Sequence, residues 1–114
     1  MSILSELKTL IEAKSVPVET GAHTSEPKDT YCVLTPMVDD FFFADDRPDF
    51  ETNEVRISLF CKGNYIQTVK GIVNALIQAD FTITDRRYLE YETETGYYHY
   101  VIDVAKEYKF EEEI

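Results

Sequence analysis

Residues 86–106 read RRYLEYETETGYYHYVIDVAK, and this stretch decides the fold. Apolar and polar side chains alternate over residues 86–93 and again over residues 98–106, which is typical of half-buried strands. Thr95 and Gly96 lie between the two runs and fit a two-residue turn, because glycine readily adopts the positive φ angles of tight hairpins. The stretch therefore predicts an antiparallel β-hairpin.

A two-residue turn at this position also predicts the register of the hairpin. It places Leu89 opposite Ile102 and Tyr91 opposite Tyr100 on one face, while the other face carries mostly charged residues. A slip of one strand by a single residue would mix glutamates with isoleucine and tyrosine on the same face, which disfavours that register. We therefore expect the face that carries these four residues to line the core.

Two further strands are predicted upstream of the hairpin. Residues 53–61 alternate strictly, and one face of that strand carries Val55, Ile57, Leu59 and Cys61. Residues 30–34 form a shorter β-prone run. We expect this run to stop before Pro36, because proline cannot donate a hydrogen bond to a strand ladder.

Two amphipathic helices are also predicted. Ser2 is a suitable N-cap for the first helix, which covers residues 3–14 and is followed by Pro17. Asn64 is a suitable N-cap for the second helix, which runs to about Asp80. The apolar residues of the second helix are expected to form one buried stripe: Ile66, Val69, Val73, Leu76 and Ile77.

The remaining segments are expected to connect these elements. Residues 16–29 contain two prolines and a glycine and are predicted to form a loop. Residues 39–49 form an aromatic and acidic excursion, in which three consecutive phenylalanines (Phe41, Phe42 and Phe43) lie between paired aspartates. Pro48 makes a helix there unfavourable.

The order of elements is therefore helix, strand, loop or hairpin, strand, helix, strand, strand. Each helix has one apolar stripe to bury, so packing both helices on one face of the sheet satisfies the whole pattern. We predict a single α+β domain over residues 1–114, with a mostly antiparallel sheet and two helices on one face. The acidic tail, residues 109–114, is expected to fray.

The charge balance excludes some classes of partner. The 114 residues include 22 acidic and 11 basic side chains, for a formal net charge of −11. Attraction to a nucleic-acid backbone or to an anionic membrane needs clustered Lys and Arg, so neither is expected. The amphipathic N-terminal segment carries Glu6 and Glu12 and is typical of a domain helix rather than a signal peptide. Two cysteines are too few for a disulfide framework, and we expect a reducing cytoplasm.

Motifs for catalysis or metal binding are weak. Cys32 and Cys61 fall in β-prone runs and are best interpreted as small buried apolar residues. His23 and His99 have no cysteine or second histidine at ligand spacing, so no zinc site and no cofactor is predicted. The four glycines are scattered singly, which excludes a phosphate-binding loop. The sequence makes no case for an enzyme.

The acidic segment offers one alternative. Asp45, Asp46 and Asp49 form the pattern Asp-Asp-x-x-Asp, which resembles the magnesium-binding motif of prenyl-diphosphate enzymes. Those enzymes carry the motif on a helix of a much longer all-helical chain, whereas Pro48 opposes a helix here. A divalent cation held by clustered carboxylates remains an alternative, but a solvated acidic loop is the favoured interpretation.

The C-terminal tyrosines raise a separate question. Aromatic side chains on a sheet can stack on nucleic-acid bases, but here they alternate with Glu90, Glu92, Glu94 and Asp103. These carboxylates would repel a phosphate backbone. Tyrosine is also frequent in protein–protein contacts and in half-buried strands, and we favour that interpretation.

The order of features resembles a known family. Residues 31–34 form a short strand that leads to aromatic residues and to Ala44-Asp45-Asp46. VRISLF at residues 55–60, a helix rich in Ile, Val and Leu, and YETETGYYH at residues 91–99 follow. Over residues 1–110, this order is similar to that of the small tail terminator proteins, also called tail completion or head–tail joining proteins, of long-tailed phages and Gram-positive prophages.

The resemblance implies a structural virion protein without a cofactor. It would be made in the cytoplasm of a bacterial host, assemble as a ring (typically a hexamer), cap the tail tube and join it to the head completion protein. Phe41, Phe42 and Phe43 are then candidates for the subunit interface, because ring subunits expose apolar surface to their neighbours. Asp45, Asp46 and Asp49 are candidates for the channel wall, where negative charge would let DNA pass without specific binding.

Two other classes stay open at this point. One is a small dimeric α+β module that binds a ligand or regulates a partner, which a closed apolar pocket would favour. The other is an acidic DNA mimic, which would need carboxylates at phosphate-like spacing over one continuous face.

Overall fold

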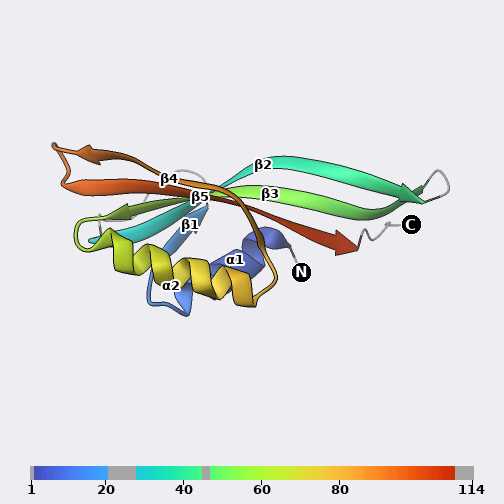
Figure 1. The fold of residues 1–114 in the computed structure, drawn as a ribbon, viewed down its shortest axis with the longest axis horizontal. Helices are drawn as coiled ribbons and strands as arrows, with labels where there is room; N and C mark the ends of the chain where they lie inside the picture. Colours follow the sequence, from blue (N-terminus) through green and yellow to red (C-terminus); the bar gives the residue numbers. More distant parts are fainter. Residues whose placement is uncertain (1, 21–27, 45–46, 110–114) are drawn as a thin grey trace.

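The computed structural model describes residues 2–20, 28–44 and 47–109. In these residues the elements are α1 (Ile3–Glu12), β1 (Val18–Thr20), β2 (Thr30–Ala44), β3 (Arg47–Cys61), α2 (Tyr65–Gln78), β4 (Thr82–Glu92) and β5 (Tyr97–Lys109). The strands form one sheet in the order β1-β2-β3-β5-β4 (Figure 1). Only the pairing of β1 with β2 is parallel, and the other three pairings are antiparallel.

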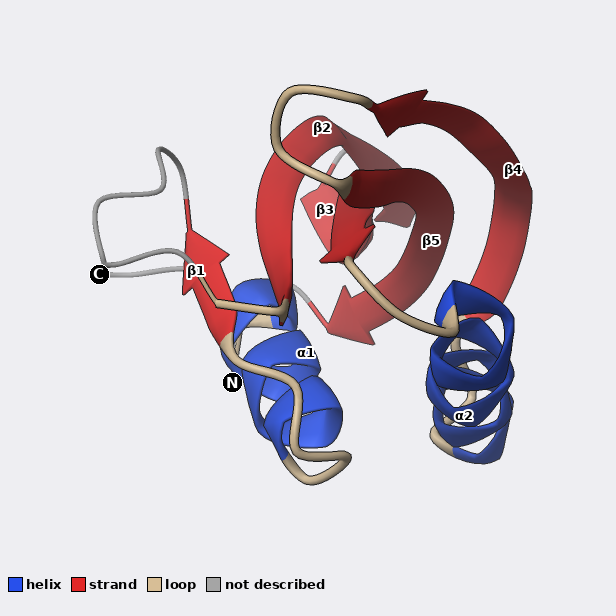
Figure 2. Cartoon of the chain, turned by 90° about the vertical axis from the view of Figure 1, so that its left-hand side faces the viewer, coloured by secondary structure: helices blue, strands red, loops and turns tan. Residues whose placement is uncertain are grey.

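The core lies between the sheet and the two helices. Figure 2 shows the curled sheet with α1 and α2 on the same side of it. The predicted alternation of residues 53–61 is confirmed, since Val55, Ile57, Leu59 and Cys61 are all buried. They pack against side chains from both helices and from β5, chiefly Leu7, Ile11, Ile72, Leu76, Ile102 and Val104. The predicted α+β class, with two helices on one face of a mostly antiparallel sheet, is therefore confirmed.

Both helix N-termini follow the sequence prediction. The Ser2 hydroxyl accepts a hydrogen bond from the Ser5 amide at 3.2 Å, and the Asn64 side chain accepts one from the Gln67 amide at 3.3 Å. These caps satisfy amides that have no partner within the first turn. Each helix is slightly shorter than predicted, because α1 ends at Glu12 and α2 at Gln78.

The buried side of α2 differs from the predicted stripe. Its buried residues are Val69, Ile72, Ala75 and Leu76, whereas Ile66 and Ile77 are exposed. Tyr65 explains the rotation of the helix, because its ring stacks on Tyr88 and Tyr98 at centroid distances of 5.6 and 5.1 Å. These contacts turn the Tyr65 side of α2 toward the sheet and leave Ile66 and Ile77 facing outward.

The segment around Pro36 is a strand rather than a loop. β2 continues through Pro36 to Ala44, and β3 begins at Arg47, so the predicted excursion over residues 39–49 belongs to one long hairpin. Proline is tolerated on edge strands and at bulges, and a bulge follows Pro36 directly. The prediction that the strand stops before Pro36 is therefore wrong. The predicted loop over residues 16–29 is also partly wrong, since it contains β1.

The C-terminal hairpin is confirmed, but its register is not. Tyr91 pairs with Tyr98 and not with Tyr100, because the connection has four residues, 93–96, instead of two. Gly96 has a φ of +80° there, and its amide donates to the Glu92 carbonyl at 2.7 Å.

Leu89 is the residue most affected by this difference. It occupies a bulge between Tyr88 and Glu90 and is 42% exposed. Arg86, and not Leu89, lies opposite the fully buried Ile102. Tyr91 is also exposed, while Tyr100 packs against the core as predicted. A bulge shifts the pairing by one residue, which periodicity alone does not reveal.

Lys106 connects both helices to the sheet. Its ammonium group donates to the Glu6 carboxylate of α1 at 2.7 Å and to the carbonyl of Ala79, the C-cap of α2, at 2.9 Å. It also lies 4.6 Å from the ring centroid of Phe81. The charge thus satisfies a carbonyl at a helix C-terminus and holds α1 and α2 on one face.

The molecule is elongated, with extents of 53 × 26 × 23 Å. The helices cover one half of the sheet, and the β2–β3 hairpin projects beyond them together with the end of β5 (Figure 1). Lys109 pairs with Phe50 of β3, so it does not belong to a frayed tail. Residues 110–114, the rest of that predicted tail, lie outside the described residues.

Candidate assembly surfaces

The projecting hairpin carries the first predicted interface residue. Phe41 lies on β2 and is 48% exposed. Met37, Val38 and Phe50 are also exposed on the hairpin, and we call these four residues the hairpin surface. Phe41 pairs with Glu51, and the next pair along the hairpin is Phe42 with Phe50. Side chains of consecutive pairs point to opposite faces, so Phe41 and Phe50 lie on opposite faces of the hairpin.

The other predicted interface and channel residues are placed less completely. The backbones of Phe42 and Phe43 belong to β2, but their side chains lie outside the described residues, as do Asp45 and Asp46 entirely. Asp49 lies on β3 near the end of the hairpin and is exposed. The alternative cation site thus lies mostly outside the described residues and stays a prediction; within the described part of the chain, no group of three or more metal-ligating side chains is present.

The edge strand β4 carries a second exposed apolar surface. Tyr88, Leu89 and Tyr91 are each exposed by more than two fifths, and we call them the β4 surface. Tyr91 packs against Tyr98 of β5 with a centroid distance of 4.7 Å. The sequence analysis assigned Leu89 and Tyr91 to the core and so missed this surface. Periodic apolar residues look alike whether they contact the core or a partner.

A cluster of rings covers the helix-free face of the sheet. Phe60 stacks on Tyr31 at a centroid distance of 4.9 Å and on His99 at 4.2 Å, and Tyr97 meets Tyr31 edge-on at 5.5 Å. The Tyr97 hydroxyl also donates to the Lys28 carbonyl. Each ring comes from a different position on β2, β3 or β5, so the cluster fixes the alignment of these strands.

His99 is the titratable member of this cluster. Burial lowers the pKa of its imidazole below the ordinary value, against the opposing effect of Glu92 and Glu90. The Nε2 atom is buried and has no hydrogen-bond partner among the described residues. Both features favour the neutral form of the ring in the folded protein.

An ion pair adjoins the ring cluster on the same face. Arg56 donates two hydrogen bonds to the Asp103 carboxylate, at 2.8 and 3.0 Å, across the β3–β5 pairing. The buried Asp103 is thereby neutralised in a fork-shaped contact. Such a pair aligns two central strands, and it leaves neither group directed at a substrate.

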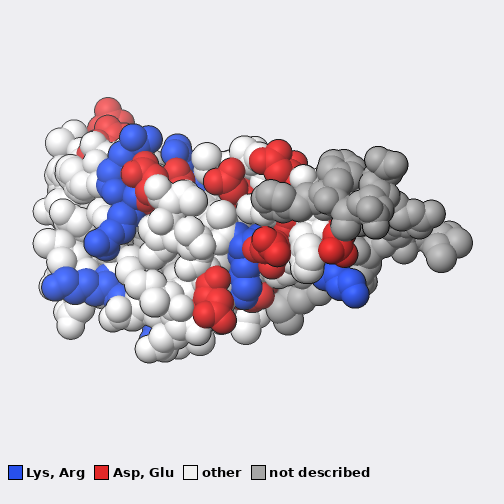
Figure 3. All heavy atoms as spheres, turned by 45° about the vertical axis from the view of Figure 1, so that its right-hand side comes forward, with Lys and Arg blue, Asp and Glu red and all other residues white. Residues whose placement is uncertain are grey.

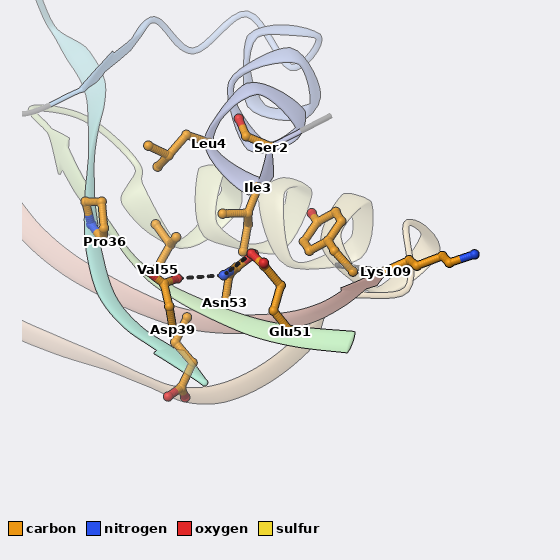
Figure 4. A pocket seen from close by; sticks show the side chains of 11 residues that line it. Ser2, Ile3, Leu4, Pro36, Asp39, Glu51, Asn53, Val55 and Lys109 are labelled. Atoms are coloured by element: carbon orange, nitrogen blue, oxygen red, sulfur yellow. Dashed lines mark hydrogen bonds between the residues drawn. The ribbon is translucent and has the colours of Figure 1, made fainter. Parts of the chain in front are cut away.

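A cleft of about 540 Å³ lies between the start of α1 and the base of the projecting hairpin (Figure 4). Asn53 is buried at its wall and donates to Asp39 at 2.6 Å and to Glu51 at 3.0 Å. Both amide hydrogens are thus used to hold carboxylates of β2 and β3 together. The cleft is open and has a mixed lining, in which carboxylates and Lys109 lie beside apolar side chains such as Ile3, Leu4 and Val55, so it differs from the closed apolar pocket expected of a small-molecule module.

The cysteines are buried, as predicted. Cys32 and Cys61 are both free, and burial raises the pKa of the Cys32 thiol to about 12. A thiol held in its protonated form is a poor nucleophile and a poor metal ligand. His23, the other histidine considered as a ligand, lies outside the described residues.

Charge is mixed on the molecular surface. On the face drawn in Figure 3, many Lys and Arg side chains lie toward the left end and others lie farther right, while carboxylates are spread over the whole visible face among them. Arg86 and Arg87 are exposed on β4, whereas Asp39 and Asp40 are exposed on β2. This face is not the continuous acidic surface that a DNA mimic would need.

No protein-family model matches the chain, and a search of curated proteins finds no match either. No helix of the described part is long and apolar enough to span a membrane. The geometry defines a class, namely an α+β domain with one curled sheet and two exposed apolar surfaces, one on the β2–β3 hairpin and one on β4.

Proposed function

We propose that the chain is a structural subunit that assembles as a ring at the end of a phage-type tail. In this role it would cap the tail tube and join it to the head completion protein. The observation that carries the proposal is the projecting hairpin, which leaves the helix-covered part of the sheet and exposes Phe41 and Phe50 on its two faces. Clustered exposed apolar residues of this kind mark contacts with other proteins.

A ring fits the geometry better than a two-fold dimer. The hairpin surface and the β4 surface belong to different strands, so a contact between them is head-to-tail. Head-to-tail contacts build a ring where the rotation between copies closes, whereas a two-fold dimer needs the same surface on both copies. The resemblance in the order of elements favours six subunits.

The channel is proposed to be lined in part by the acidic end of the hairpin. Asp49 is exposed there, and Asp45 and Asp46 are its neighbours in sequence. Fixed negative charge within about 8 Å of passing DNA would repel the phosphates and prevent sticking. Changing all three aspartates to Asn should permit assembly and make the ring retain DNA at low salt. Unchanged DNA retention at low salt would remove these residues from the channel wall.

The decisive test of the proposed function is assembly. Purified protein at high concentration is examined by negative-stain microscopy and by mass measurement, alone and with the tail tube protein of the same genome. Rings are expected, and Phe41→Ser should abolish them while leaving the subunit folded by circular dichroism. Ile77→Ser is the matched control, because Ile77 is equally open to solvent but lies on α2.

Two results would contradict the proposal. One is a protein that stays monomeric at every concentration and with the tube protein present. The other is a stable two-subunit particle that Phe41→Ser does not affect, which would favour the dimeric module instead.

A further inference from the structure

Besides the three-residue β1, the sheet has two longer edges, of nearly equal length, that no described strand covers. β1 pairs only with residues 32–34 of β2, so residues 35–44 of β2 have β3 on one side and no described strand on the other. β4 likewise pairs with β5 on one side only. The open part of β2 has ten residues by these bounds, and β4 has eleven. Such edges offer unpaired amides and carbonyls to another strand.

We infer that β4 of one copy pairs antiparallel with residues 35–44 of β2 in the next copy. The inference rests on the proposed function, since it names the contact that would build the ring. Neighbouring strands β2, β3, β5 and β4 alternate in direction, so β2 and β4 run in opposite directions. In a ring whose axis runs along the strands, each strand has the same direction in every copy. β4 of one copy therefore meets β2 of the next copy in an antiparallel arrangement.

Charge complementarity selects one register for this pairing. Arg86 and Arg87 are consecutive and exposed on β4, and Asp39 and Asp40 are consecutive and exposed on β2. Placing Arg87 opposite Asp39 in an antiparallel pair also places Arg86 opposite Asp40. Among the described residues of its own copy, Arg87 makes a long contact of 3.7 Å with the exposed Asp85, so its guanidinium group can also reach a carboxylate of the neighbour. Opposite charges facing each other across two strands stabilise the pair.

The same register matches two exposed apolar residues and one bulge of each strand. It places Tyr88 opposite Val38 and Leu89 opposite Met37, all four of which are exposed in the single chain. Leu89 is the extra residue of the β4 bulge between Tyr88 and Glu90, and Met37 is the extra residue of the β2 bulge between Pro36 and Val38. Two bulges that face each other leave the residues on either side in phase.

The ends of the two strands agree as well. With Arg87 opposite Asp39, Thr82 lies opposite Ala44, and Tyr91 lies opposite Thr35, the first open residue of β2. Leu34 is the last residue of β2 that β1 covers. β4 of the neighbour would therefore fill the open edge of β2 and stop where β1 begins.

A charge-swap experiment tests the pairing. Arg86→Asp and Asp40→Arg each place like charges at every contact, so each variant alone should assemble at least about tenfold more weakly than the wild type. A one-to-one mixture of the two variants should assemble again, because alternating copies restore an opposite-charge pair at every contact. Lys70→Asp is the matched control for a charge change on an exposed residue of α2, and it should assemble as the wild type does.

Cysteine cross-linking tests the register. Val38→Cys combined with Tyr88→Cys should give a ladder of covalent oligomers on a non-reducing gel. Val38→Cys combined with Thr84→Cys, four residues out of register, should give no ladder. Cys32 and Cys61 are buried, so the unmodified chain provides the background.

The outcomes separate this inference from the proposed function. If the wild type forms rings and both charge-swap variants form them equally well, the edge pairing is wrong and the proposed ring assembly stands. A second outcome is that Arg86→Asp weakens assembly, Asp40→Arg does not, and Tyr88→Cys alone gives covalent dimers. This outcome would show that β4 pairs with β4 of another copy, and it would also overturn the inference. If the wild type does not assemble at all, both the edge pairing and the proposed function are wrong.

Discussion

Replacing Ile102 with alanine should destabilise the protein strongly. Ile102 is 0% exposed and lies on β5 between Ile57 of β3 and Arg86 of β4. The substitution removes three carbon atoms, which at about 0.8 kcal/mol for each buried methylene corresponds to about 2.4 kcal/mol. The cavity that remains raises the expected loss to roughly 2–5 kcal/mol, because the surrounding strands can relax only in part.

Leu89→Ala is the matched comparison, since it removes the same number of carbon atoms from the neighbouring strand. Leu89 is 42% exposed, so only the remaining part of its surface leaves water on folding. Scaling the transfer term by that part gives at most about 1.4 kcal/mol, and no closed cavity is formed. The predicted two-residue turn would have buried Leu89 opposite Ile102, so the pair of variants discriminates between the two registers.

The assay is urea unfolding followed by circular dichroism, with tyrosine fluorescence as a second probe. The chain has eight tyrosines and no tryptophan, which makes the fluorescence signal uniform in type. A lower urea concentration at the unfolding midpoint, with an unchanged slope of the unfolding free energy against urea, would identify a loss of stability. A loss of 1 kcal/mol corresponds to about 4 °C in melting temperature for a domain of this size. Equal losses for the two variants would refute the packing described for β4 and β5.

Three further predictions follow from individual side chains. Gly71→Ala should stabilise the protein by about 0.5–1 kcal/mol in thermal melts, because Gly71 lies inside α2 and an added Cβ meets nothing within 4 Å; a destabilised variant would mean that α2 packs differently. Lys106→Met should cost about 1–3 kcal/mol in urea unfolding, because it removes hydrogen bonds to Glu6 and to the end of α2, and a neutral effect would contradict that connection. His99→Gln should flatten the pH dependence of stability. The pKa of His99 is lowered by burial, so the unfolded chain binds its proton first and the wild type loses stability as pH falls below about 6.5; parallel pH profiles for variant and wild type would contradict this.

The parts of the fold with undisturbed periodicity could be predicted from the sequence. Val55, Ile57 and Leu59 alternate without interruption, and the strand they predict is at the centre of the core. Ser2 and Asn64 predicted both helix starts, because capping is a local interaction between a side chain and an amide three residues later.

The parts that could not be predicted depend on tertiary context. Pro36 signals a strand end when the strand has neighbours on both sides, but among the described strands β3 alone lies beside β2 at this point. The face of α2 was misjudged because Ile66 and Tyr65 are both apolar enough to be buried. Stacking of Tyr65 on Tyr88 and Tyr98 decides between them, and that contact joins residues distant in the sequence.

The exposure of one candidate interface residue agrees with the sequence, while its role in assembly stays a prediction. Phe41 was singled out because three consecutive phenylalanines cannot all be buried by one short segment, and it is exposed. The β4 surface was missed because Leu89 and Tyr91 continue the apolar alternation of a core strand. Alternation of apolar residues indicates that one face of a strand is shielded from water. It does not indicate whether a helix of the same chain or another protein provides the shield.

The exposed strand edges differ in how well they are protected against pairing with another strand. Monomeric sheet proteins avoid edge-to-edge association with very short edge strands, prolines or charges. β1 has three residues, and the open part of β2 carries Pro36 and two aspartates, so both are protected in this way. β4 has eleven residues, no proline and an exposed Tyr88-Leu89 pair, so its protection is limited to bulges and a few charges. An edge of that length and composition would promote nonspecific aggregation unless a specific strand covered it. If β4 pairs with the open part of β2 as proposed, its basic pair restricts the partner, because a strand that does not offer two carboxylates at the right position leaves Arg86 and Arg87 unmatched.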